Sequence, residues 1–128
     1  MCDKQKFFLC SNCGNLAGLI FNKGVPMMCC GKKMDELVPN TVEASTEKHL
    51  PVVSVQDSSI DVQIGSVLHP MAEDHHISFV FVETENGGQR KCLKTGDEPK
   101  LSFSFVNDKP IAVYAYCNLH GLWKTEIK

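Results

Sequence analysis

The side chains of this sequence best suited to bind a metal are its seven cysteines and five histidines. Thiolates and imidazoles are the groups that zinc and redox-active iron prefer in proteins. In a reducing compartment, a chain with this many cysteines is more typical of metal binding or redox chemistry than of disulfides. The cysteines stand at positions 2, 10, 13, 29, 30, 92 and 117.

The first candidate site consists of Cys10, Cys13, Cys29 and Cys30, two close pairs separated by fifteen residues. Four cysteines in two pairs are typical of a tetrahedral all-thiolate site for zinc or iron. Adjacent cysteines argue against disulfides, because their Cα atoms lie about 3.8 Å apart across a trans peptide, below the ~4.4 Å at which ordinary disulfides begin. The spacing does not distinguish zinc from iron.

The second candidate site draws on histidines scattered along the rest of the chain. They occur in Glu47-Lys48-His49-Leu50-Pro51, His69-Pro70, His75-His76-Ile77 and Cys117-Asn118-Leu119-His120-Gly121. A lone histidine is more often an ordinary surface or core residue than a ligand. These histidines, however, fall at expected turns or strand ends, where loops from distant sequence converge at one edge of a sheet.

Several imidazoles with a single thiolate suit a redox metal such as ferrous iron better than structural zinc. Adjacent strand residues point to opposite faces, so His75 and His76 are not expected to serve together. Cys2 and Cys92 lack a partner pattern, and we interpret both as non-ligating.

The elements that hold these residues are predicted to be almost entirely strands. Residues 1–37 are rich in Cys, Gly, Asn and Lys and are too short to fold without a metal or another cross-link. Val38-Pro39-Asn40 is typical of a linker. Residues 38–128 contain roughly seven short strands with alternating apolar residues, which predicts an antiparallel sandwich of immunoglobulin-like architecture.

Within that sandwich the alternation assigns faces and turns. Ile77, Phe79 and Phe81 are expected on one face of a strand, with Val80 and Val82 opposite. Asn86-Gly87-Gly88 is typical of the turn of a hairpin. No stretch of convincing length has a helical period.

Composition excludes several functional classes. Hydrophobic residues make up 43% and charged residues 22% of the chain, and the formal net charge is −2. Arg90 is the only arginine, and basic residues do not cluster, so nucleic acid is not expected as a partner. Apolar runs are far shorter than the roughly 20 residues needed to span a membrane, and the first residues do not resemble a secretory signal. A cytoplasmic location is therefore expected.

Together these motifs resemble desulfoferrodoxin, the two-iron class of superoxide reductase, over nearly the whole chain. Cys10-x2-Cys13 with Cys29-Cys30 is similar to the desulforedoxin-type centre of that family. Four further motifs are similar to its catalytic centre: Glu47-Lys48-His49-x-Pro51, His69-Pro70-Met71, His75-x-Ile77 and Cys117-Asn118-x-His120-Gly121-x-Trp123.

The resemblance implies two mononuclear non-haem iron ions. The four cysteines would hold the first, in a rubredoxin-like domain. The second would take equatorial His49, His69, His75 and His120 and axial Cys117, with an open sixth position. Glu47 would occupy that position in the resting ferric state, and Lys48 would lie beside it. The resemblance also implies a homodimer and a rubredoxin-like electron donor.

Charge counting agrees with this division of roles. Four thiolates leave iron with net charge −1 or −2 and no vacancy, which suits electron transfer alone. Four neutral imidazoles and one thiolate leave ferrous iron at +1 with a vacancy, which suits one-electron reduction of superoxide to hydrogen peroxide. An axial thiolate donates electron density to the ligand opposite. Two alternatives stay open at this point: an electron carrier with a saturated second centre, and a zinc-binding interaction module.

Overall fold

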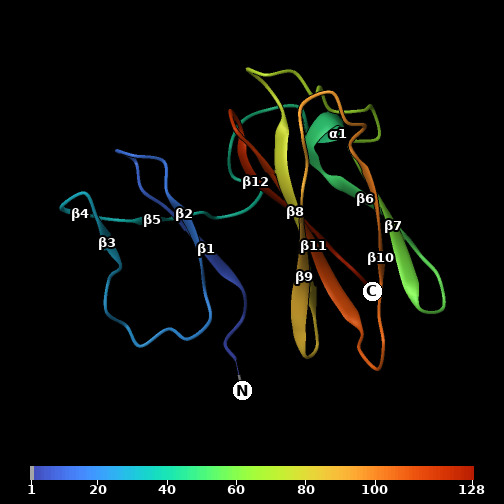
Figure 1. The fold of residues 1–128 in the computed structure, drawn as a ribbon, viewed down its shortest axis with the longest axis horizontal. Coiled ribbons are helices and arrows are strands. Elements are labelled where there is room, and N and C mark those ends of the chain that lie inside the picture. Colours follow the sequence, from blue (N-terminus) through green and yellow to red (C-terminus); the bar gives the residue numbers. More distant parts are fainter. Residues whose placement is uncertain (1) are drawn as a thin grey trace. The chain divides into compact units, whose positions relative to one another are not determined.

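The computed structural model describes residues 2–128, which divide into two compact units, one ending at Val38 and the other spanning Pro39–Lys128 (Figure 1). The expected boundary lay between residues 37 and 38. The described chain contains one helix, of four residues, and no helix that is long and apolar enough to cross a membrane.

The first unit is a small assembly of short strands. They are β1 (Lys6–Leu9), β2 (Leu16–Leu19), β3 (Met28–Cys29), β4 (Lys32–Lys33) and β5 (Asp35–Glu36). β1 lies between β2 and β5, and β3 pairs with β4. The buried hydrophobic side chains of this unit are Phe7, Cys10 and Met34. So small a core leaves much of the unit's stability to another source, as the sequence predicted.

The second unit is a sandwich of two antiparallel sheets (Figure 1). Its strands are β6 (Pro51–Val55), β7 (Ser59–Ile64), β8 (Ile77–Thr84), β9 (Gly87–Cys92), β10 (Lys100–Ser104), β11 (Pro110–Cys117) and β12 (Gly121–Glu126). One sheet has the order β10-β7-β6 and the other β12-β11-β8-β9. The nearly all-β fold predicted from the sequence is confirmed.

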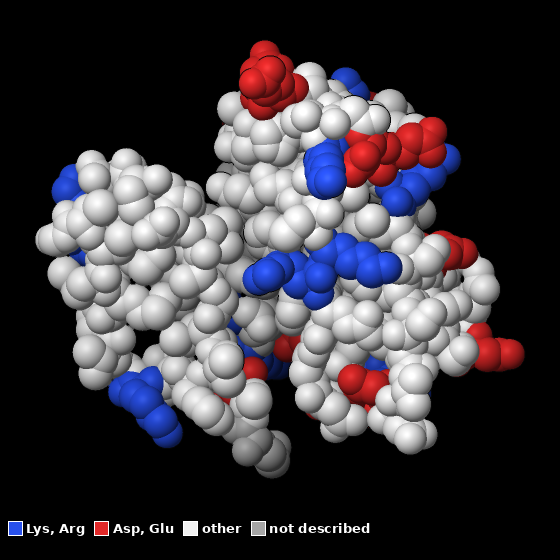
Figure 2. Space-filling model, viewed as in Figure 1, with Lys and Arg blue, Asp and Glu red and all other residues white. Residues whose placement is uncertain are grey.

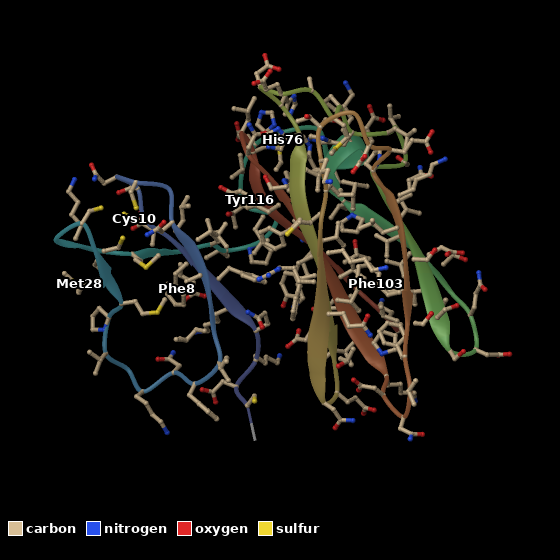
Figure 3. The ribbon with its side chains drawn as sticks, viewed as in Figure 1. Phe8, Cys10, Met28, His76, Phe103 and Tyr116 are labelled. Atoms are coloured by element: carbon tan, nitrogen blue, oxygen red, sulfur yellow. The ribbon has the colours of Figure 1, made fainter. Side chains whose placement is uncertain are left out.

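Alternating apolar residues build the core between the two sheets, as the sequence pattern predicted. Ile60, Val62 and Ile64 of β7 are at most 2% exposed, as are Val80 and Val82 of β8. The ring of Phe103 on β10, labelled in Figure 3, is among the largest fully buried side chains.

One detail of the expected face assignment is wrong. Ile77 belongs to the core with Val80 and Val82, whereas Phe79 is absent from that cluster. The pairing of β8 with β11 shifts register between Tyr116 and Cys117, where a bulge adds one residue to β8. A bulge reverses the alternation, because two residues then face one. The bulge lies beside Cys117, at the end of the sheet that carries the histidines.

The β8–β9 hairpin also turns earlier than expected. The turn consists of Glu85 and Asn86, and both glycines belong to β9. A Cβ atom at Gly88 would lie 2.8 Å from the carbonyl oxygen of Val82. Gly88 is therefore required by close backbone approach within the hairpin rather than by the turn.

Asn40, from the expected linker, is bound into the second unit. Its backbone adopts a positive φ of 63°, which asparagine tolerates better than most residues. Its side chain accepts a hydrogen bond from the Lys124 N–H at 2.9 Å and donates to the Lys124 carbonyl at 3.1 Å. Asn40 thereby extends the edge of the sheet beyond β12.

Helix α1 (Thr46–His49) sits over the turn that follows β7. Gly65, with φ of +85°, donates to the Leu50 carbonyl at 3.0 Å. A Cβ atom at Gly65 would press into the carbonyl oxygen of Val67 and lie 2.7 Å from that of Lys48. A residue with a side chain would therefore displace the segment that carries His49.

We expect Gly65→Ala to destabilise the second unit by about 2–4 kcal/mol, because a strained φ and overpacking act together. Gly96→Ala is the matched control: Gly96 has φ of +89° but open space around its Cβ position. Denaturant unfolding of both variants measures the difference. Equal losses of stability would contradict the proposed backbone contact.

Candidate metal centres

The four cysteines predicted as the first site lie together in the first unit. Cys10 and Cys13 flank the turn after β1, Cys29 ends β3, and Cys30 takes a positive φ of 53° in the β3–β4 turn. Their sulfur atoms all lie within 4.8 Å of one another (Figure 3, near Cys10). Cys10 is buried, whereas Cys13 and Cys30 are exposed.

Polar hydrogens surround these sulfurs. The Cys13 N–H donates to the Cys10 sulfur at 3.5 Å, and the backbone and side chain of Asn15 donate to the sulfurs of Cys13 and Cys29 at 3.4 and 3.6 Å. Backbone N–H groups of Cys13 and Asn12 lower the pKa of Cys10 to about 6, while the neighbouring sulfur of Cys13, followed by that of Cys10, raises the pKa of Cys29 to about 12. Four sulfurs this close ionise together only around a cation, which fits a tetrathiolate metal centre.

The second predicted set converges at one end of the sandwich from five places in the sequence. His49 ends α1, His69 follows the turn after β7, and His75 lies in a bend before β8. Cys117 ends β11, and His120 lies in the turn that leads into β12. The ligand-type atoms of the first four lie within 4.8 Å of one another.

His120 completes the cluster through its Nδ1 atom. That atom lies 3.1 Å from Nε2 of His49 and 3.8 Å from the Cys117 sulfur. The ring centroids of His75 and His120 are 5.1 Å apart. All five predicted residues are thus brought together, and their span is about twice a metal–ligand bond of about 2.1–2.3 Å.

In His49 and His69, the ring nitrogen that faces away from the cluster is held by a backbone carbonyl. Nδ1 of His49 donates to the Ser45 carbonyl at 2.6 Å, and Nδ1 of His69 donates to the Pro70 carbonyl at 2.7 Å. Nε2 of His69 and of His75 are buried without a hydrogen-bond partner among residues 2–128. Buried polar atoms without partners cost free energy, so these lone pairs fit a metal ion.

Burial also sets the protonation states. It lowers the pKa of His49 and His75, and that of His69 to about 4. The positive charge of Lys48 adds to the lowering for His49 and His75. Burial raises the pKa of Cys117, and N–H groups of Leu119 and His120 oppose that rise. Lowered pKa values favour the neutral form of these three imidazoles, the form that binds metals.

Glu47 and Lys48 precede His49 on α1, and both side chains are exposed. His76 lies outside the cluster: its Nδ1 lies 3.0 Å from the Ala72 carbonyl, and Figure 3 shows it where the loop enters β8. The expectation rested on strand alternation, but β8 begins only at Ile77, so the bend separates the two histidines. Cys2 and Cys92 are exposed and belong to neither group.

Trp123 is a site residue to which the sequence analysis gave no role. Its indole stacks on the His49 ring, with centroids 4.9 Å apart and an interplanar angle of 25°. Its Nε1 donates to the His120 carbonyl at 3.1 Å, and the side chain is only 3% exposed. Trp123 lies inside the last quoted motif, but only the fold shows that it contacts two of the histidines.

Comparison with known proteins agrees with this geometry. The family profile described as Desulfoferrodoxin matches residues 41–126. Desulfoferrodoxin of Syntrophotalea carbinolica is 39% identical over 126 residues, covering 98% of this chain and 99% of its own length. The chain belongs to the desulfoferrodoxin family. The match with the relative includes both units, so the family assignment covers both metal centres.

Solved structures give the same result. The superoxide reductase of Treponema pallidum superimposes with a TM-score of 0.81 at 32% identity, covering 97% of this chain and all of that one. A one-iron superoxide reductase of Giardia intestinalis matches 65% of this chain with a TM-score of 0.54 at 28% identity. Both donor sets of this chain fit the mononuclear iron centres of the family.

We expect His75→Ala to lose or perturb the second metal while His76→Ala retains it, because only the His75 ring reaches the cluster. Metal analysis and visible spectra of the two variants measure this. The two residues are adjacent, so each variant is the control for the other. Reversed behaviour would move the ligand by one residue.

Proposed function

We propose that this protein is a superoxide reductase with one iron in each unit. The observation that carries the proposal is the buried convergence of four imidazoles and one thiol, with unpartnered ring nitrogens turned inward. Cys10, Cys13, Cys29 and Cys30 would hold the first iron in a unit bounded near residue 37. His49, His69, His75, His120 and Cys117 would hold the second, in the unit that follows.

A ferrous iron held by these residues would supply the one electron that, with two protons, reduces superoxide to hydrogen peroxide without forming dioxygen. Burial lowers the pKa of His49, His69 and His75, so these imidazoles favour the neutral form and Cys117 would be the one anionic ligand of the bound metal. Cys117 is fully buried at the base of the cluster. Its sulfur would therefore hold the metal out of contact with solvent.

Lys48 and Glu47 are proposed to act at the mouth of this site. The Lys48 charge reaches His49 and His75, since it contributes to the lowering of both pKa values. A cation at that position attracts an anionic substrate and helps order the water that supplies protons. Glu47, on the same exposed turn of α1, is proposed to occupy the open position in the oxidised resting state.

The first centre is proposed to pass single electrons, since four thiolates leave no position for a substrate. A small rubredoxin-like protein is proposed as the external donor. We further propose a cytoplasmic location, where seven unpaired cysteines stay reduced. A homodimer is supported by exposed apolar side chains on the small first unit, among them Ile20, Phe21 and Val25.

Nucleic acid has less support as a partner, and the two alternative functions can be distinguished by spectra. The formal net charge is −2, and the face drawn in Figure 2 carries acidic as well as basic side chains. A zinc-binding interaction module would be colourless, whereas ferric thiolate absorbs visible light. A pure electron carrier would have a saturated second centre, so azide would leave its spectrum unchanged.

The decisive experiment combines metal analysis, visible spectra and superoxide consumption with oxygen detection. We expect two irons per chain, superoxide loss without oxygen release, and at least a 100-fold loss of rate in Cys117→Ser, of the order seen when a group acting only in the transition state is removed. The spectrum of the four-cysteine centre should survive that change. Near-normal activity of Cys117→Ser would refute the assignment.

We expect Lys48→Ile to slow the second-order reaction with superoxide about 2- to 10-fold at low salt and to flatten its salt dependence. Iron content should stay unchanged, because Lys48 is not a proposed ligand. Lys109→Ile is the control, since it removes the same charge beside the β8–β9 turn, at the other end of β8 from the histidines. Stopped-flow kinetics at several salt concentrations compare the two. Equal rates in both variants would exclude a steering role.

A further inference from the structure

Of the four clustered histidines, His75 has the side chain that is least firmly held by hydrogen bonds. His49 and His69 are 2% exposed, and each has Nδ1 fixed by a carbonyl. His120 follows Cys117 closely, and Trp123 holds its backbone carbonyl. His75 is only half-buried, and among residues 2–128 neither of its ring nitrogens has a protein hydrogen-bond partner. Its ring is therefore placed by the backbone of its own loop and by packing against the rings of His69 and His120, whose centroids lie 4.6 and 5.1 Å away.

That loop is a tight bend with few fixed points. Ala72 and His75 exchange two backbone hydrogen bonds of 2.9 and 3.2 Å, which close the bend on itself. At its far end, the N–H of Ile77 points to the Met71 sulfur at 3.4 Å. These contacts shape the bend. The pairing with the strand that carries Cys117 begins only at Ile77, so the residues of the bend itself need another connection to it.

Asn118 makes that connection. Its Oδ1 accepts a hydrogen bond from the His76 N–H at 2.8 Å, and its Nδ2 donates to the Asp74 carbonyl at 3.0 Å. Its own N–H donates to the His76 carbonyl at 3.2 Å. One amide side chain thus grips the backbone on both sides of His75, from the residue directly after Cys117.

We propose that Asn118 is a positioning residue that fixes His75 relative to Cys117 in the second iron site. The geometry requires a donor and an acceptor on one short, planar group. Aspartate keeps the acceptor for His76, but when ionised it cannot donate to the Asp74 carbonyl. Alanine offers neither. The two backbone groups that this side chain bridges therefore require asparagine. The position is exposed, so the amide makes both hydrogen bonds without being buried.

The inference rests on the proposed function in one respect, namely that His75 and Cys117 hold the same iron. Loss of an outer contact that orients a ligand typically lowers metal affinity 10- to 100-fold. Both Asn118 bonds are exposed to water, so the lower end of that range applies. We expect Asn118→Ala to release the second iron roughly 10-fold faster, and Asn118→Asp to lie between it and the parent.

The experiment uses the full-length, two-iron protein and follows iron transfer to a ferrous chelator, with visible spectra of both centres. Asn86→Ala is the matched control, because Asn86 donates from its side chain to the Asn107 carbonyl at 3.4 Å beyond the other end of β8. Faster release and an altered second-centre spectrum in the Asn118 variants, with the four-cysteine spectrum unchanged, support the proposal.

Release from Asn118→Ala within 2-fold of Asn86→Ala would overturn the positioning role. If Asn118→Ala does not accumulate as folded protein, Asn118→Asp decides the same comparison. His75→Ala distinguishes a failure of the proposed iron site from a failure of the proposed role of Asn118. A second iron whose content and spectrum are unchanged in His75→Ala refutes the proposed site itself, whereas loss or perturbation of the iron in His75→Ala but not in the Asn118 variants refutes only the positioning role of Asn118.

Discussion

The burial of imidazole nitrogens without protein partners is the constraint around which the second unit is organised. Nε2 of His69 and of His75 are enclosed and lack hydrogen bonds, next to a fully buried Cys117. Such an arrangement is unfavourable by itself, because each lone pair has lost its water. A cation that accepts all of these lone pairs removes the penalty. Metal binding and the stability of this end of the sandwich are therefore linked.

The sandwich brings these side chains together because its strands are rigid and short loops join them at one end. Strands β8 and β11 fix where the bend before Ile77 and the turn after Cys117 begin, while α1 rests on the turn containing Gly65. The first unit brings its metal ligands together in a different way. Its sulfurs approach one another on hairpin turns, with N–H groups directed at them, and two of its four cysteines stay exposed. Exposure favours electron exchange, and enclosure favours chemistry on a small anion.

Much of this arrangement could be predicted from the sequence because its signals are local. Alternation identified strands such as 60–64, and cysteine spacing identified the first site. The face of Ile77 could not be predicted, since it depends on a bulge created by pairing with β11. The separation of His75 from His76 was expected for strand residues, but it comes from a bend. The inward-facing nitrogen of His49 and of His69 is Nε2 because Nδ1 of each ring is bound by a carbonyl that only the fold supplies.

The stacking of Trp123 on His49 has a spectroscopic consequence. Trp123 is the only tryptophan in the chain, so the ultraviolet-excited emission characteristic of indole arises from one buried ring. That ring lies against one proposed iron ligand and is hydrogen-bonded to the backbone of another. Open-shell iron quenches a fluorophore at such short range. The intensity of this emission therefore reports loading of the second centre.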